Sequence, residues 1–167
     1  MSDDTFHRVI RQYAAPLARV AASYARHDSQ QEDLLQEIYF ALWKALPTFR
    51  GESRELTFVL SVAHNRGITY AARLRRSAFL SLPESTPDPN PSPDGEFERR
   101  ERVDSMYEAM QRLPDAQRQA MMLHLEGLSG KEIAAVQGTT ENNVNVRLNR
   151  ARARLRALVG ESEGDIE

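Results

Sequence analysis

The chain has 167 residues, of which 41% are hydrophobic and 28% charged, and a net charge of −2. These values are typical of a folded protein with one ordinary domain or two small ones. No cysteine is present, which excludes disulfides and thiolate metal sites. No apolar run approaches the ~20 residues of a membrane-spanning helix, and the acidic start MSDDTFHRVI does not resemble a signal peptide. We therefore expect a cytoplasmic protein without membrane insertion.

A proline-rich acidic segment divides the chain. The stretch SLPESTPDPNPSPDGE contains five of the eight prolines, and residues 77–98 carry five acidic side chains and no Lys or Arg. Such a segment cannot build a helix or a core, so we expect it to be extended. Aromatic residues and β-branched runs are scarce, which favours helices over sheets. We predict an all-α protein with two small helical domains at 1–78 and 99–160, a flexible linker at 79–98 and an acidic tail at 161–167.

The first domain opens with a predicted helix from about Asp4 to Arg26, which Pro16 kinks or breaks. A second helix begins at the motif Ser29-Gln-Gln-Glu32, which has the spacing of a capping box. It continues to about Leu46 and ends at Pro47. Its apolar stripe consists of Leu34, Leu35, Ile38, Ala41, Leu42 and Ala45.

The opposite, polar face of this second helix also carries Phe40 and Trp43. Two large aromatic side chains among acids indicate a docking surface for another protein. The alternative is that the first helix or the linker covers them.

The third predicted helix spans about Leu56 to Arg76 and follows the loop Phe49–Ser53. Val59, Leu60, Ala63, Tyr70, Ala71 and Leu74 form the face expected to pack inward. The other face combines basic, amide, hydroxyl and aromatic groups, a pattern that suits single-stranded nucleic acid. Alternatively, Phe58 packs on a neighbouring helix and the terminal arginines only solvate the helix end. This second face contains Phe58, Val62, Asn65, Thr69, Arg73 and Arg76.

The second domain contains four predicted helices. The first two cover Phe97–Arg112 and Asp115–Glu126. A short helix to Gln137 opens with a second capping-box motif, Ser129-Gly-Lys-Glu132. The turn Gly138-Thr-Thr140 supplies a Thr as N-cap for the last helix. We expect this last helix to run from Glu141 to about Val159 and to end at Gly160.

The last two helices have the layout of a helix-turn-helix, whose second helix reads the DNA major groove. One face of the last helix is apolar: Val144, Leu148, Ala151, Leu155, Leu158 and Val159. The opposite face carries Asn142, Val146, Asn149 and Ala153, with Asn145 and Arg150 beside it. Asn can bond adenine and a Val methyl can touch thymine, while the flanking arginines suit phosphates. The alternative is an amphipathic helix with a solvated arginine face, which explains the asparagines less well.

Taken together, these segments resemble a bacterial RNA polymerase sigma factor of the extracytoplasmic-function group of the sigma-70 family. The matching stretches are QEDLLQEIYFALWKALPTFRGES with LSVAHNRGITYAARLRR, and LPDAQRQAMMLHLEGLSGKEIAAVQGTTENNVNVRLNRARARLRAL. They are similar to the family's regions two and four, in the right order around a linker. The resemblance implies a promoter-specific transcription initiation factor with no catalysis, cofactor, metal or small-molecule substrate of its own.

The resemblance also implies partners and site residues. Region two would dock on the β′ clamp helices of core polymerase, the β flap would be a further contact, and an anti-sigma factor is expected. The predicted polymerase-binding residues are Asp33, Gln36, Glu37, Phe40 and Trp43. The predicted −10 DNA residues are Phe49, Arg50, Gly51, Ser53, Phe58, Asn65, Thr69, Arg73 and Arg76. The predicted −35 DNA residues are Thr140, Asn142, Asn143, Asn145, Val146, Arg147, Asn149, Arg150 and Arg154.

The chain departs from the family pattern at Asn145, Val146 and Asn149, which suggests a different −35 preference. The aromatic melting patch of housekeeping relatives is reduced to Phe58, so few promoters should be opened. Two rival functions are a stand-alone helix-turn-helix regulator that does not act through core polymerase, and an inactive decoy that only binds protein. His7, His27, His64 and His124 are scattered without metal-like spacing, so we expect no active site.

Overall fold

The computed structural model describes residues 3–80 and 96–164, and within these ranges it contains helices and no strand. The all-α prediction is confirmed. Most of the predicted linker, and the end of the predicted acidic tail, lie outside the described residues. The elements in chain order are α1 (Asp3–Gln12), α2 (Ala14–Tyr24), α3 (Asp28–Ala45), the 3₁₀ turn η1 (Leu46–Thr48), α4 (Glu55–Leu80), α5 (Glu96–Gln111), α6 (Asp115–Leu125), α7 (Gly130–Gln137) and α8 (Glu141–Gly164).

The first predicted helix is broken, but at a different place from the one expected. The interruption falls at Tyr13, where φ is −109° and ψ is 17°, and not at Pro16. Pro16 lies in the first turn of α2. Backbone N–H groups in the first turn have no acceptor within the helix, so the missing N–H of proline breaks no hydrogen bond there. The prediction of a break is therefore confirmed and its position is corrected.

The first capping-box prediction is wrong. Helix α3 begins at Asp28 behind the N-cap residue His27, and no side chain caps its first turn. Ser29 already lies within the helix, so its hydroxyl is not at the capping position. Asp28 instead places a carboxylate in the first turn, where the helix dipole favours negative charge.

Two helices are longer than predicted. Helix α4 continues past Arg76 to Leu80, and α8 continues through Gly160 to Gly164. Gly160 is not among the glycines with positive φ, whereas Gly138 ends α7 in the left-handed conformation at φ 60°. A glycine ends a helix when the chain needs that conformation, and the chain turns at Gly138 but not at Gly160.

The helix-turn-helix is built as the local sequence predicts. Ser129 accepts a bond from the Glu132 amide at 3.2 Å, and the Glu132 carboxylate accepts one from the Ser129 amide at 2.8 Å, so the second capping box is confirmed. The Thr140 hydroxyl accepts a bond from the Asn143 amide at 3.2 Å and caps α8. The direction and start of the last helix thus follow from short-range signals.

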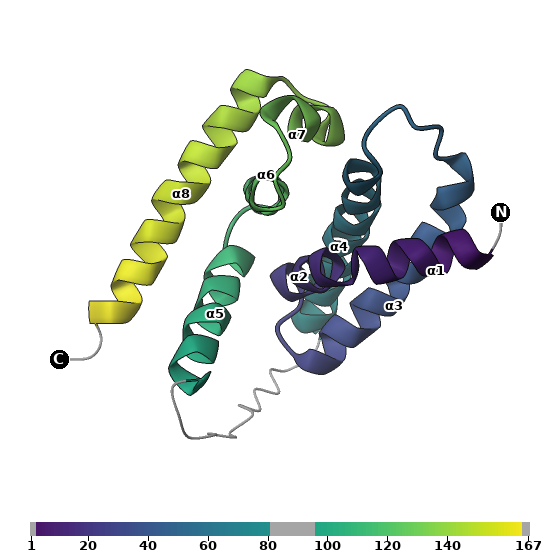
Figure 1. Cartoon of the computed structure of the whole chain (residues 1–167). Coiled ribbons are helices and arrows are strands. Elements are labelled where there is room, and N and C mark those ends of the chain that lie inside the picture. The colour runs from purple at the N-terminus through teal and green to yellow at the C-terminus, as the bar shows by residue number, and fades with distance from the viewer. Residues whose placement is uncertain (1–2, 81–95, 165–167) are drawn as a thin grey trace.

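The two lobes pack against each other in this structure. Helices α1 to α4 form one lobe and α5 to α8 the other, with α6 and α7 beside α2 and α4 (Figure 1). One continuous set of buried side chains connects Leu17, Leu34 and Leu60 of the first lobe with Leu123 and Ile133 of the second. Helix α8 runs along the outer side of the second lobe, with one face left to solvent (Figure 1).

Candidate nucleic-acid interface and docking surface

Helix α8 presents the predicted reading face to solvent. Val144, Leu148 and Ala151 are buried against the rest of the lobe. The opposite face is exposed, and it contains Asn142, Asn145, Val146, Asn149, Arg150, Ala153 and Arg154. This face offers amide groups and two small apolar side chains, which are groups that can read base edges in a major groove.

Four predicted or flanking residues of this region are engaged inside the protein. The Asn143 amide group donates to the Thr139 hydroxyl at 3.0 Å, and Thr140 is the N-cap. Arg147 donates to the Gln137 side-chain oxygen at 2.8 Å. Arg152 lies within 3.2 Å of the His124 ring nitrogen. These side chains hold the helix-turn-helix together in the DNA-free chain.

The aromatic pair on α3 is exposed. Phe40 is 56% and Trp43 49% exposed, and their rings are stacked at 6.2 Å between centroids. The Lys44 ammonium lies 4.3 Å from the centre of the Phe40 ring. The alternative that the first helix covers this pair is wrong, and any cover by the linker would involve residues outside those described. An exposed aromatic pair of this kind is typical of a protein-docking surface.

The polar residues predicted beside this pair differ in their surroundings. Asp33 and Gln36 are exposed. Glu37 is half-buried and forms an ion pair with Arg73, and Arg66 lies 3.9 Å away from it. Glu37 therefore joins the predicted polymerase-binding face of α3 to the predicted DNA-binding face of α4.

The loop before α4 is held at one end by an aromatic contact. The rings of Phe49 and Phe58 lie 4.8 Å apart, and Phe58 packs against the core. Arg50 and Ser53 are exposed, and Gly51 has a φ of 74°, which a side chain would strain. The alternative for Phe58, packing on its neighbours, is confirmed, and its contact with −10 DNA stays a prediction.

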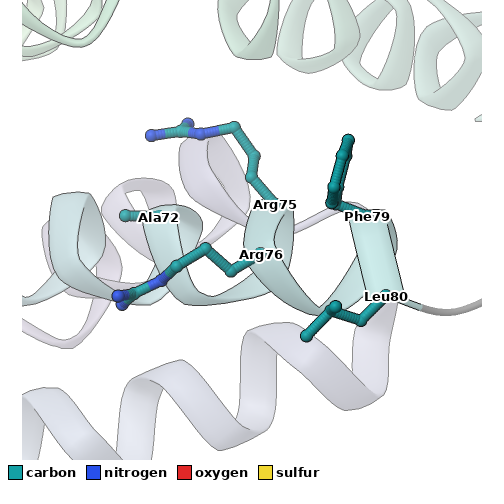
Figure 2. A pocket seen from close by; sticks show the side chains of 5 residues that line it. All are labelled: Ala72, Arg75, Arg76, Phe79 and Leu80. Carbon is teal, nitrogen blue, oxygen red and sulfur yellow. The ribbon is translucent and has the colours of Figure 1, made fainter.

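The exposed face of α4 carries the remaining predicted −10 residues. Asn65, Thr69, Arg73 and Arg76 are all exposed. The last turns of α4 border a shallow surface pocket formed by Ala72, Arg75, Arg76, Phe79 and Leu80 (Figure 2). In Figure 2, Arg75 and Phe79 extend to the same side of the helix. Cationic and aromatic groups therefore continue along α4 beyond the predicted set.

The contact between the lobes depends on residues that the sequence did not single out. Arg19 binds the Glu126 carboxylate through two bonds of 2.5 and 2.9 Å. Arg54 binds Glu132 through two bonds of 2.5 and 2.8 Å, and the Thr57 hydroxyl donates to the same carboxylate at 3.1 Å. The partners are 75 to 107 positions apart, so no local pattern indicates these pairs.

Arg118 is a further interlobe residue that sequence reasoning missed. Its side chain is buried, and it donates to the backbone oxygens of Met110, Gln111 and Leu113. The guanidinium also lies 4.8 Å from the centre of the Tyr24 ring in the other lobe. A buried Arg bonded to three carbonyls is a structural residue, because all its main donors are satisfied within the protein.

The buried His64 has no catalytic arrangement. Its Nδ1 lies 3.0 Å from the Tyr24 hydroxyl, and burial lowers its pKa from 6.5 to about 3. The ring is therefore neutral at physiological pH and serves as a packed core group.

Among the described residues, no group of three or more His, Cys, Asp and Glu side chains could hold a metal ion. None of the described helices has the length and apolarity needed to cross a membrane.

An apolar groove of about 300 Å³ lies between α2, α5 and α6. Its floor and walls include Met106, Met110, Met122 and Leu125. Val103 and Met106 are each 47% exposed, and Leu125 is 66% exposed. Such a Met-lined surface can adapt to an apolar partner.

Each of the two lobes matches a model of a known protein family. Residues 9–77 match the family model for sigma-70 region 2, and residues 104–155 match the model for sigma-70 region 4. The RNA polymerase sigma-H factor of Pseudomonas aeruginosa is 31% identical over 139 residues, which are 75% of this chain and 72% of that protein. The sigma factor NccH of Alcaligenes xylosoxydans xylosoxydans is 28% identical over 165 residues, 95% of this chain and 88% of that protein. The ECF sigma factor SigX of Bacillus subtilis is 27% identical and covers 89% of this chain and 80% of its own length.

Solved structures show the same fold. The sigma factor RpoE of Bartonella quintana, in complex with the anti-sigma factor NepR, superposes with a TM-score of 0.71 at 22% identity, over 93% of this chain and 97% of that chain. CnrH, in complex with the cytosolic domain of CnrY, superposes with a TM-score of 0.67 at 24% identity, over 96% and 90%. The chain belongs to the sigma-70 family of RNA polymerase sigma factors, in the extracytoplasmic-function group, and is a transcription initiation factor and not an enzyme.

Proposed function

We propose that this sigma factor directs core RNA polymerase to a small set of promoters by holding DNA at two places. The observation that carries the proposal is the pair of exposed polar faces, one on α8 and one on α4, in a single chain. The first would read the −35 element as duplex, and the second would hold unpaired bases of the −10 element. We assign the first DNA contact to residues 99–160 and the second to residues 1–78.

At the −35 element, α8 would enter the major groove with its exposed face. Asn142, Asn145, Val146 and Asn149 reach outward and can contact base edges. Arg150 and Arg154, which are also exposed, suit the phosphates on either side. The capped start of α8 at Thr140 orients this face.

At the −10 element, the loop from Phe49 to Ser53 and the exposed face of α4 would hold extruded bases. Extruding a base costs a few kcal/mol, which contacts in a pocket offset. The Phe49–Phe58 contact supports the loop. Asn65 and Thr69 supply hydrogen-bonding groups and Arg73 and Arg76 supply positive charge, the combination that single strands require.

Core polymerase would bind through two apolar surfaces. The β′ clamp helices would contact α3 at Phe40 and Trp43, with Asp33, Gln36 and Glu37 beside them. The β flap would occupy the Met-lined groove between α2, α5 and α6. Aromatic and Met side chains that are exposed in the free chain are suited to such interfaces.

An anti-sigma factor is a further partner in this proposal. Two sigma factors that share the fold were solved in complex with NepR and with the cytosolic domain of CnrY, respectively. By analogy, a partner protein would hold this chain away from polymerase.

The test is selection from a randomised promoter pool with purified core polymerase. We expect transcripts only when the chain is present, with one motif enriched near −10 and another near −35. Failure to bind core polymerase at low salt would contradict the proposal. A stand-alone regulator would instead bind duplex DNA specifically without polymerase, and a decoy would leave transcription unchanged when Asn145, Asn149 and Arg150 are replaced by Ala.

A further inference from the structure

The arginines of α8 differ in what they contact. Arg147 is half-buried and donates to the Gln137 side-chain oxygen at 2.8 Å. The Gln137 side-chain nitrogen in turn donates to the Ala116 backbone oxygen at 2.8 Å and to the buried Gln119 oxygen at 3.1 Å. Arg147 is thus the first member of a hydrogen-bonded series that runs from α8 through the end of α7 to α6.

A second series connects the same helices farther along α8. Arg152 lies 3.2 Å from Nε2 of His124, in the last turn of α6. Another nitrogen of the same guanidinium donates to the Asn149 side-chain oxygen at 3.4 Å. Arg152 therefore contacts α6 on one side and a predicted base-reading residue on the other.

Arg150 and Arg154 have different surroundings. Both are exposed, and in the part of the chain that the structure describes neither side chain forms an ion pair or a hydrogen bond. Their guanidinium groups can approach phosphates without breaking a contact to any of the described residues. Arg147 and Arg152 could do so only by giving up their bonds to α7 and α6.

We propose that Gln137 with Arg147, and His124 with Arg152, are positioning residues that determine specificity, because they set the rotation of the reading helix about its own axis. This inference rests on the proposed −35 recognition and changes the predicted role of Arg147 from a DNA contact to a positioning residue. The phosphate contacts are then left to Arg150 and Arg154.

The physical reason lies in the geometry of a groove-reading helix. Successive residues are separated by 100° around the helix axis, so a small rotation moves Asn145, Val146 and Asn149 relative to the base edges. The buried stripe of Val144, Leu148 and Ala151 consists of apolar contacts, which are non-directional. The two directional contacts lie at different positions along α8. Arg147 ties the helix to α7 and, through Gln137, to α6, and Arg152 ties it directly to α6.

Arg152 also constrains the Asn149 side chain. With its oxygen accepting from Arg152, the Asn149 amide has one of its two acceptor lone pairs occupied and keeps both N–H donors. Bidentate bonding to adenine needs an outward donor and an outward acceptor, whereas guanine O6 and N7 or thymine O4 need only donors. We therefore expect an acceptor-rich base, guanine or thymine, to be favoured opposite Asn149 over the adenine expected from an unconstrained Asn.

The salt dependence of promoter binding separates the two roles. Each neutralised phosphate adds about 0.9 to the slope of log K against log salt concentration. For holoenzyme on a duplex promoter, we expect R150A and R154A each to reduce that slope by about 0.9. R147A should leave the slope unchanged, and it would overturn the inference if it lost the same amount as R150A.

Base preference is the second measurement, made with a promoter pool randomised at −35. Q137L carries no charge change and lies outside the reading face, yet we expect it to broaden the selected −35 motif at several positions. At the promoter position whose base preference is lost in N149A, R152A should shift the preference toward adenine. An unchanged motif in both Q137L and R152A would contradict the proposal.

Conservative variants exclude a merely structural role. R147K keeps a donor for Gln137, and H124Q keeps an acceptor for Arg152, so both should retain the wild-type motif, while R147A and H124L should not. Equal melting temperatures for each pair would show that the motif and not the fold has changed. If the wild-type holoenzyme selected no −35 motif, the proposed function itself would fail; if it selects one that these variants leave unaltered, only this inference fails.

Discussion

Arg54 and Glu132 form a two-bond ion pair between the lobes, at 2.5 and 2.8 Å, although 78 positions separate them in the chain. The same Glu132 carboxylate closes the capping box of α7 by accepting from the Ser129 amide. Arg54 directly follows the loop predicted to hold the −10 element, and Glu132 lies in the first helix of the helix-turn-helix. One carboxylate therefore takes part both in the start of α7 and in one of the contacts between the two lobes.

Replacing these two residues separates the roles of the carboxylate. R54A removes the interlobe pair and leaves the capping box, so we expect a looser contact between the lobes with little change in the melting temperature, because an exposed pair contributes little and the buried interlobe contacts remain. E132A removes the pair and also the bond from the Ser129 amide, while the Ser129 hydroxyl still accepts from the backbone amide of residue 132, so it should lose less than the ~1 kcal/mol of a whole N-cap. Small-angle scattering measures the extension of the chain and thermal unfolding the stability. Identical melting temperatures for the two variants would show that the bond from the Ser129 amide to the Glu132 carboxylate contributes nothing.

Acid should weaken the same contact. The bond from Arg54, with that from the Ser129 amide, lowers the Glu132 pKa from 4.5 to about 2. Because the folded pKa lies below the unfolded one, this stabilisation is complete above about pH 4.5 and disappears as the pH falls toward 2. Denaturant unfolding at several pH values in this range should show a smaller loss in R54A than in the wild type. Parallel pH profiles would contradict the assignment.

Gly67 provides a test of packing between α2 and α4. A Cβ at this position would lie 2.5, 2.7 and 2.9 Å from three ring carbons of Tyr24. Tyr24 is buried beneath Arg118 and bonded to His64, so its ring has little room to move. We expect G67A to destabilise the protein by ~1–3 kcal/mol, as overpacking does. Denaturant unfolding measures this difference.

The matched control is G160A. Gly160 also lies in a helix, but nothing lies within 4 Å of a Cβ placed there. Removing a helical glycine in open space should stabilise the helix by up to ~1 kcal/mol. Destabilisation of similar size by both substitutions would mean that the Tyr24 contact is not the cause.

The aromatic pair on α3 should matter for polymerase binding and not for folding. Because Phe40 and Trp43 are about half exposed, F40A and W43A should change the melting temperature little. Aromatic residues at the centre of an interface often contribute more than 1.4 kcal/mol, which is tenfold in affinity. We therefore expect each variant to bind core polymerase about tenfold or more weakly in a competition assay. A large loss of melting temperature would show that the pair is structural.

Much of the second lobe was predictable because its signals are short-range. The Ser129–Glu132 capping box, the Thr140 N-cap and the two faces of α8 depend on residues within four positions of one another, and all three appear in the structure. The same reasoning failed at Ser29. An equally good motif begins there, but Ser29 lies inside the helix, two residues after the N-cap residue His27. A capping motif defines a preferred helix start, and the packing of α3 against its neighbours decided which residue is used.

The sequence by itself determined the helical class, the order of the two lobes and which face of α8 is left to solvent, since hydrophobic periodicity and capping act within one helix. Only the tertiary structure decided what each arginine does. Arg54, Arg118, Arg147 and Arg152 look alike in the sequence, but each has a particular acceptor on another element. A guanidinium on a long, flexible side chain takes its role from the acceptor that lies within reach, and that acceptor is brought there by the fold.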